Sequence, residues 1–198
     1  MASNNKIIHP GWLRVNHWIN LIAVVIMVLS GWEIYNASPI FDFSFPKQIT
    51  LGGWLAGGLL WHFAAMWLLF FNGLFYLGMN LFSGRLKVRF FPIRVRDLLS
   101  DFINAFKGKL AHENLAEYNA VQKLAYLFVI VDIILLVLSG LVIWKPVQFP
   151  LLREFMGDYD NARIVHFIAM AALLAFTVIH VVMVALIPKT LLMMIRGR

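Results

Sequence analysis

Residues 163–187 read RIVHFIAMAALLAFTVIHVVMVALI, an apolar stretch with one charged residue, Arg163, and two histidines, His166 and His180. About 20 predominantly apolar residues are enough for a helix to cross the hydrocarbon layer of a membrane. Because lipid offers no hydrogen-bonding partners, the backbone of such a stretch has to satisfy its own polar groups as a helix. The sequence therefore predicts a membrane-spanning helix that carries a histidine toward each end.

Three further stretches are apolar and long enough to span a membrane, and they lie at about 12–35, 48–80 and 118–144. The 198-residue chain is 61% hydrophobic and 14% charged, with a mean hydropathy of +0.78. A soluble domain is about half apolar and about a quarter charged. We therefore expect an all-α, integral membrane four-helix bundle that forms a single domain over residues 1–198.

The positive charges predict how this bundle is oriented. If the four spans alternate in direction, thirteen Lys and Arg residues fall on one side of the membrane and four on the other. The positive-inside rule assigns the richer side to the cytoplasm, so both termini are expected there. Membrane insertion and contact with anionic lipid headgroups account for the formal net charge of +7, and no nucleic-acid partner is expected.

The loop at 83–117 mixes charged residues with apolar residues at helical spacing, namely Leu98, Leu99, Phe102, Ile103 and Phe106. This pattern is typical of an amphipathic helix that lies on the membrane surface, here the cytoplasmic one. An ordinary solvated connecting helix accounts for the pattern equally well.

The chain contains no cysteine. This excludes disulfides, cysteine-ligated iron–sulfur clusters and covalently attached c-type haem. A redox cofactor in this protein would therefore be held by histidine, methionine or carboxylate.

Four of the six histidines lie in or at the ends of the predicted spans, and they are His17, His62, His166 and His180. An ionisable residue in a membrane is costly and marks a functional site by default, although any one of them could be a hydrogen-bonded packing residue. His166 and His180 are 14 residues apart, so they share a helix face but are separated by roughly 21 Å along the axis. A single metal ion cannot bind both, whereas two cofactors at different depths can.

Matching the histidines by depth predicts two pairs. The first span starts on the cytoplasmic side and the fourth ends there, so His17 pairs with His180. The second span starts on the outer side and the fourth does too, so His62 pairs with His166. Two axial histidines on facing helices are what a six-coordinate haem b requires. We expect two haem b groups, with the histidines as ligands to their irons.

Residues near the span ends are candidates for further contacts. Arg14 and Arg163 are expected to bind the haem propionates, or to extend toward lipid headgroups instead. A quinone site near the cytoplasmic haem is predicted from hydrogen-bonding side chains close to that surface, which are Asn16, Asn20, Tyr118, Gln122 and Lys123.

Three internal features have two interpretations each. Asp132, inside the third span, either moves protons or is a neutral acid bonded to a polar neighbour, and we favour the second. Gly31 and Gly140 either admit a flat ring or simply let helices pack closely. Both glycines end the tetrapeptide Val-Leu-Ser-Gly, at 28–31 and 137–140, a match too short to define a repeat.

The assembled motifs resemble a known family. Arg14-Val15-Asn16-His17-Trp18 is similar to the R-x-x-H-W opening of prokaryotic di-haem cytochrome b subunits, found in hydrogenase, formate dehydrogenase, thiosulfate reductase and superoxide oxidase. His62 and the pair His166 and His180 match the ligand pattern of this family. Residues 118–123, YNAVQK, resemble the Y-N-x-x-Q-K motif of the thiosulfate reductase branch. The resemblance covers nearly the whole chain.

This resemblance implies a multi-pass protein of the bacterial inner membrane that exchanges electrons with quinone. It also implies docking to a periplasmic oxidoreductase subunit, such as a molybdopterin enzyme. A stand-alone superoxide:quinone oxidoreductase is the alternative, with Lys145, Arg153 and Arg163 steering the anion. A histidine-based metal transporter is disfavoured by the depth separation of His166 and His180. Assembly into homo-oligomers is left open.

Overall fold

The computed structural model describes residues 9–85, 92, 94–106 and 119–197 of the chain. Every regular element in this part is a helix and none is a strand. Four helices are long and apolar enough to cross a membrane: α1 (Gly11–Ala37), α2 (Leu55–Phe82), α5 (Ala120–Trp144) and α7 (Tyr159–Leu186). They confirm the four predicted spans and the all-α fold class.

Contacts among the residues divide the chain into two compact units. One unit is His9–Leu77, which contains α1, the short 3-10 helix η1 (Lys47–Ile49) and most of α2. The other unit continues from Gly78 and contains α4 (Val95–Phe106), α5, α6 (Pro150–Phe155), α7 and α8 (Pro188–Arg196). Each predicted haem ligand pair draws one histidine from each unit.

An asparagine cluster holds α1 against α2 in the first unit. The Asn16 amide nitrogen donates to the Asn72 backbone and side-chain oxygens at 2.8 and 2.7 Å. The Asn72 amide nitrogen donates in turn to the Asn16 backbone oxygen at 2.9 Å and to Asn20 Oδ1 at 2.7 Å. Hydrogen bonds between helices stabilise packing in lipid, where burial of apolar surface does not drive association.

Replacing Asn72 by Ala removes three of these four side-chain bonds. We expect the free energy of unfolding in detergent micelles to fall by about 1–2 kcal/mol, since interhelical bonds in membranes contribute about 0.6 kcal/mol on average. Titration with a denaturing detergent measures this change, with Leu74→Ala, on an exposed position of the same helix, as the control. Equal stability of Asn72→Ala and the unmodified chain would contradict the role of the cluster.

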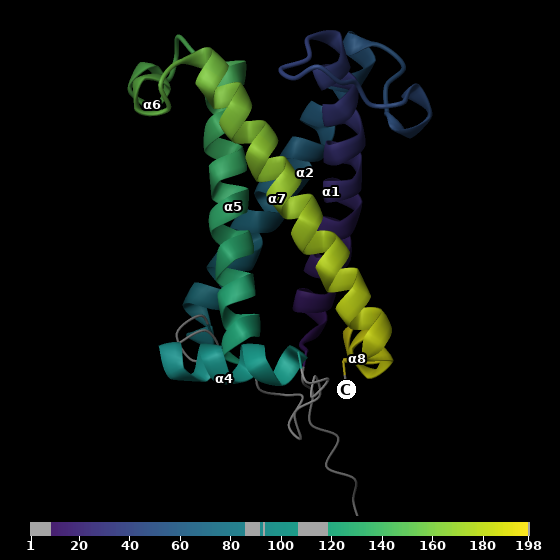
Figure 1. Cartoon of the computed structure of the whole chain (residues 1–198), viewed down its shortest axis with the longest axis vertical. Helices are drawn as coiled ribbons and strands as arrows, with labels where there is room; N and C mark the ends of the chain where they lie inside the picture. The colour runs from purple at the N-terminus through teal and green to yellow at the C-terminus, as the bar shows by residue number, and fades with distance from the viewer. Residues whose placement is uncertain (1–8, 86–91, 93, 107–118, 198) are drawn as a thin grey trace, which may run out of the picture. The chain divides into compact units, whose positions relative to one another are not determined.

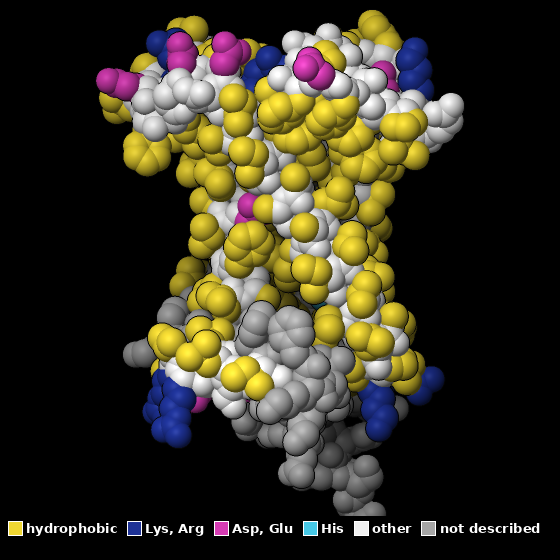
Figure 2. Space-filling view, viewed as in Figure 1, with side chains coloured by type: hydrophobic (Ala, Val, Ile, Leu, Met, Phe, Trp, Pro, Cys, Tyr) yellow, Lys and Arg dark blue, Asp and Glu magenta, His cyan; other side chains and the backbone are white. Residues whose placement is uncertain are grey.

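In the second unit, α5 and α7 pack against each other, and Figure 1 shows them side by side near α6. The buried side chains in these two helices are small or medium in size, and they include Ser139, Val142, Ala162, Ala169 and Leu173. Small residues let helix backbones approach closely. Figure 2 shows hydrophobic side chains along the flanks of both helices, as expected of surfaces that face lipid.

The amphipathic helix expected within 83–117 is confirmed for Val95–Phe106. Val95, Leu99 and Ile103 follow one another at intervals of four residues and are 72%, 61% and 50% exposed, so they form one apolar stripe. The carboxylate of Asp101 accepts a hydrogen bond from the Ala120 backbone at 2.8 Å, which joins α4 to the start of α5. Residues 86–91, 93 and 107–117 of the predicted loop lie outside the residues that the structure describes.

The helices differ from the sequence-based expectation in three places. α7 begins at Tyr159, one turn before Arg163, because Asp158 caps it by accepting a bond from the Tyr159 backbone at 2.8 Å. The segment between the third and fourth predicted spans contains α6, which has Pro150 in its first turn. The residues after Pro188 form α8, which the apolar-run criterion misses because this helix is short and amphipathic.

Candidate functional site

His62 lies on α2 with its ring against α1. The Nδ1 atom is 3.1 Å from Ser30 Oγ. A Cβ atom built on Gly31 would lie 3.4 Å from His62 Cε1, so the ring sits directly on the glycine. A branched side chain at position 31 would push the ring away.

His166 lies on α7 and meets α5 in the same way. The Nδ1 atom is 2.9 Å from Ser139 Oγ, and a Cβ atom on Gly140 would lie 3.4 Å from His166 Cε1. We call the two serine–glycine pairs, Ser30-Gly31 and Ser139-Gly140, the histidine seats. Both serines are completely buried.

Each of the matching tetrapeptides at 28–31 and 137–140 contains one histidine seat. The sequence alone shows only four identical residues. The separation between serine and histidine also differs, at 32 residues in the first unit and 27 in the second. The structure shows that each tetrapeptide holds a histidine of the following long helix of its own unit. The two units therefore carry equivalent histidines.

The other two histidines have aromatic neighbours. The His17 ring centroid is 5.4 Å from that of Trp18. The His180 ring stacks on Phe176 with centroids 5.8 Å apart and planes 16° from parallel. His17 is in the unit of α1, and His180 is in the unit of α7. The pairing of His17 with His180, like that of His62 with His166, stays a prediction.

Both arginines proposed for the propionates share a helix face with a predicted ligand. Arg14 precedes His17 by three residues in α1, and Arg163 precedes His166 by three residues in α7. Residues three apart are neighbours on a helix surface. The Arg163 guanidinium also lies 6.0 Å from the centroid of the Tyr159 ring.

The proposed quinone residues have structural contacts. Asn16 and Asn20 belong to the cluster around Asn72. Gln122 forms a capping box with Asn119 at the start of α5, with bonds of 2.7 and 3.1 Å. Lys123 donates to the Pro92 backbone oxygen at 3.4 Å. Tyr118 lies outside the described residues. Much of the YNAVQK motif thus begins a helix.

Asp132 is buried in α5, and its Oδ2 has no hydrogen-bond partner in the part of the chain that the structure describes. The bond to a polar neighbour that we favoured from the sequence is not seen for this oxygen. The side chain therefore depends on protonation or on a group outside the chain for its stability in lipid.

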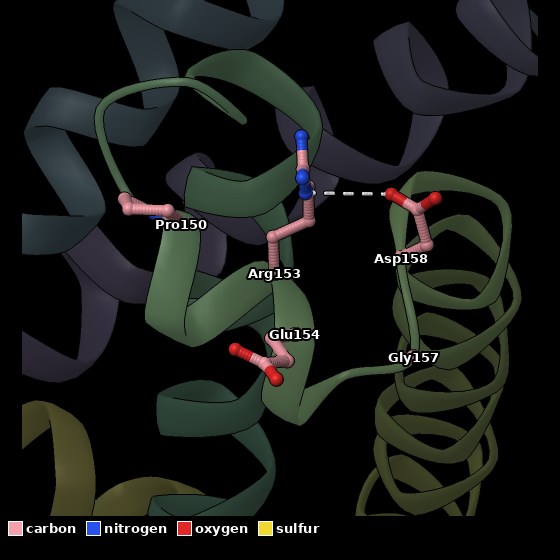
Figure 3. Close-up of a pocket in the computed structure, with 5 residues that line it drawn as sticks. All are labelled: Pro150, Arg153, Glu154, Gly157 and Asp158. Carbon is pink, nitrogen blue, oxygen red and sulfur yellow. Dashed lines mark ion pairs between the residues drawn. The ribbon is translucent and has the colours of Figure 1, made fainter.

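Of the three positive residues considered for steering an anion, Arg153 lies in α6, close to the turn that leads into α7. Arg153 Nε lies 3.5 Å from Asp158 Oδ1, as the dashed line in Figure 3 marks. Glu154 lines the same shallow depression. These two carboxylates offset the charge of Arg153, and the steering of superoxide by Lys145, Arg153 and Arg163 stays a prediction.

The donor set fits haem better than a bare metal ion. No group of three or more histidines and carboxylates capable of holding an ion occurs among the residues that the structure describes. A transition metal bound by protein alone uses three or four ligands, whereas haem needs only axial ones. Glycines beneath two of the histidine rings let each imidazole lie directly against the neighbouring helix.

Long apolar helices that carry histidines are typical of a membrane cytochrome b. Residues 8–197 match the family described as prokaryotic cytochrome b561, and the chain belongs to this family. It is therefore a haem b protein of the bacterial inner membrane that takes part in electron transfer. A protein of Azospira oryzae named "putative protein-methionine-sulfoxide reductase subunit YedZ1" is 63% identical over 197 residues, covering all of both chains. The resemblance to this class of cytochromes is confirmed.

Proposed function

We propose that this chain carries electrons from the quinone pool across the inner membrane to a periplasmic oxidoreductase. Its two haem b groups would be held by the pairs His17/His180 and His62/His166. The observation that supports this most strongly is the duplicated seat: His62 and His166 have the same serine and glycine contacts in separate units. Matching contacts support the same role for both histidines, that of an axial ligand.

Bound haem would supply a one-electron carrier at each of the two depths in the membrane. The chain's own residues bind and orient it and keep water away. If two histidines hold each haem, no position would be left open for substrate, so the chemistry would be electron transfer. Arg14 and Arg163 place a positive charge within one turn of a ligand, where it would neutralise a propionate.

The partner is inferred from the relative. Its printed name makes it a subunit of a reductase that acts on methionine sulfoxide in proteins. With 63% identity across the whole chain, we infer that the present chain serves an enzyme of that kind. Reduction of a sulfoxide to a thioether consumes two electrons and two protons and releases water. Electrons would therefore flow from quinol through this chain to the reductase, with a molybdopterin enzyme as the expected class.

The quinone site is proposed at the cytoplasmic ends of the spans. Asn20 and Lys123 are the candidates for direct contact, while Asn16 and Gln122 act through the helix contacts described above. Tyr118 is retained from the sequence pattern. Both termini would be cytoplasmic, as the positive charges predict, and the partner would meet the face that carries the α6–α7 turn.

Reconstitution into liposomes tests this function. With the soluble reductase outside, a quinol in the bilayer should reduce the haem, and a protein containing methionine sulfoxide should reoxidise it. Reoxidation should require the reductase. The control is the same mixture with an oxidised protein whose methionines have been replaced. Haem that quinol cannot reduce, or that the sulfoxide reoxidises without any reductase, would contradict the proposed route.

A further inference from the structure

The hydrogen bonds of the two seat serines determine which histidine nitrogen carries a proton. Ser30 Oγ donates to the Ile26 backbone oxygen at 2.6 Å, and Ser139 Oγ donates to the Leu135 backbone oxygen at 2.7 Å. A hydroxyl has a single hydrogen to donate. If that hydrogen goes to the carbonyl, each serine presents a lone pair toward the imidazole, which points to Nδ1 of His62 and of His166 as the donor.

This assignment determines the nitrogen that can bind iron. A neutral imidazole protonated at Nδ1 has its lone pair on Nε2. The serine hydroxyl is locked by its bond to the carbonyl four residues earlier. It is also buried completely, so water does not compete for it. The orientation of the ring and the identity of its basic nitrogen are thus set before any ligand arrives.

We propose that Ser30 and Ser139 are positioning residues that hold His62 and His166 as Nε2 ligands for one and the same haem. The Nδ1–H donated to each serine also raises the basicity of the imidazole, which stabilises the ferric form over the ferrous form. The serines thereby lower the potential of this haem. The inference rests on the proposed function, because it takes His62 and His166 as ligands.

The test replaces the serines singly and together, as Ser30→Ala and Ser139→Ala. Alanine is smaller than serine by one oxygen and favours the helical conformation. The helices that carry the seats are therefore expected to fold in these variants. Loss of such an outer contact typically weakens binding of the metal group about 10- to 100-fold. A tenfold weaker preference for the ferric form corresponds to a rise of about 59 mV in the reduction potential of a one-electron couple.

Two measurements report the effect: spectroelectrochemical titration of both haems, and the rate at which haem is lost to an excess of a haem-scavenging apoprotein. We expect the haem of His62 and His166 to titrate at a higher potential and to be lost faster. The haem of His17 and His180 should keep its potential and retention, which also shows that the protein is folded. Thr177→Val is the matched control, since Thr177 donates to the Leu173 carbonyl in the same way but belongs to neither seat.

The result separates this inference from the proposed function. Serine variants with two unchanged haems, or with both haems altered equally, would overturn the inference. If His62→Ala and His166→Ala leave both haems in place, the ligand assignment fails and the proposed function fails with it. If the histidine variants lose a haem and the serine variants alter nothing, only the positioning role is wrong.

Discussion

Replacement of His62 by Ala, or of His166 by Ala, should lower the haem content from two to one per chain. Either change removes one axial nitrogen from the same iron, and a haem held by a single histidine is released far more readily than one held by two. The haem that remains should be the same in both variants, with the same potential and absorption. Pyridine haemochrome content per chain and redox titration measure this.

External imidazole provides the control for the histidine variants. A glycine in place of His62 leaves a cavity beside the seat, and added imidazole should restore the second haem if the missing ligand is the cause. Loss of both haems from either variant, without rescue, would indicate a folding defect. Loss of a different haem from each variant would contradict the pairing.

A branched side chain on either seat glycine should have the second large effect. A Cβ atom at Gly31 or Gly140 would already lie 3.4 Å from the Cε1 of its histidine, so the further methyl groups of valine would displace the ring. We expect Gly31→Val and Gly140→Val to lose the haem of His62 and His166 and to keep the other one. Haem content per chain and redox titration of the remaining haem measure the loss.

Gly73→Val is the matched control for these variants. Gly73 lies in α2, and a Cβ built there meets nothing within 4 Å. Valine at position 73 therefore has the same lower helix propensity but makes no contact with a histidine ring. Gly31→Ala and Gly140→Ala should be tolerated, because 3.4 Å is close to an ordinary contact distance. Two intact haems in the valine variants, or haem loss in Gly73→Val, would contradict the seat geometry.

The four spans were predictable because hydropathy and length alone decide which helices can cross lipid. α8 was missed because it has nine residues and its apolar run, residues 191–195, is far too short to cross a membrane. The early start of α7 depends on Asp158, whose positive φ of 85° and side-chain bond to the next residue are local geometry. Aspartate is a common helix cap, but the sequence offers several near this point.

The histidines of the candidate site were predictable because they are polar residues in apolar runs. Of the residues that support them, Gly31 and Gly140 were singled out from the sequence, but the two serines were not. Ser30 and Ser139 resemble ordinary small residues of membrane helices, and their role shows only when the histidine of another helix is seen beside them. Asn16 and Gln122, predicted for the quinone site, form a hydrogen bond between α1 and α2 and a helix cap, which the sequence pattern did not indicate. Their role at a quinone stays a prediction.

The pairing of the histidines is tested most directly by the haem-to-protein ratio of two double variants. His62→Ala/His166→Ala removes both ligands of one proposed haem, whereas His17→Ala/His62→Ala removes one ligand from each. We predict about one haem per chain in the first variant and almost none in the second. Almost none in the first, or one in the second, would show that the ligands are paired differently.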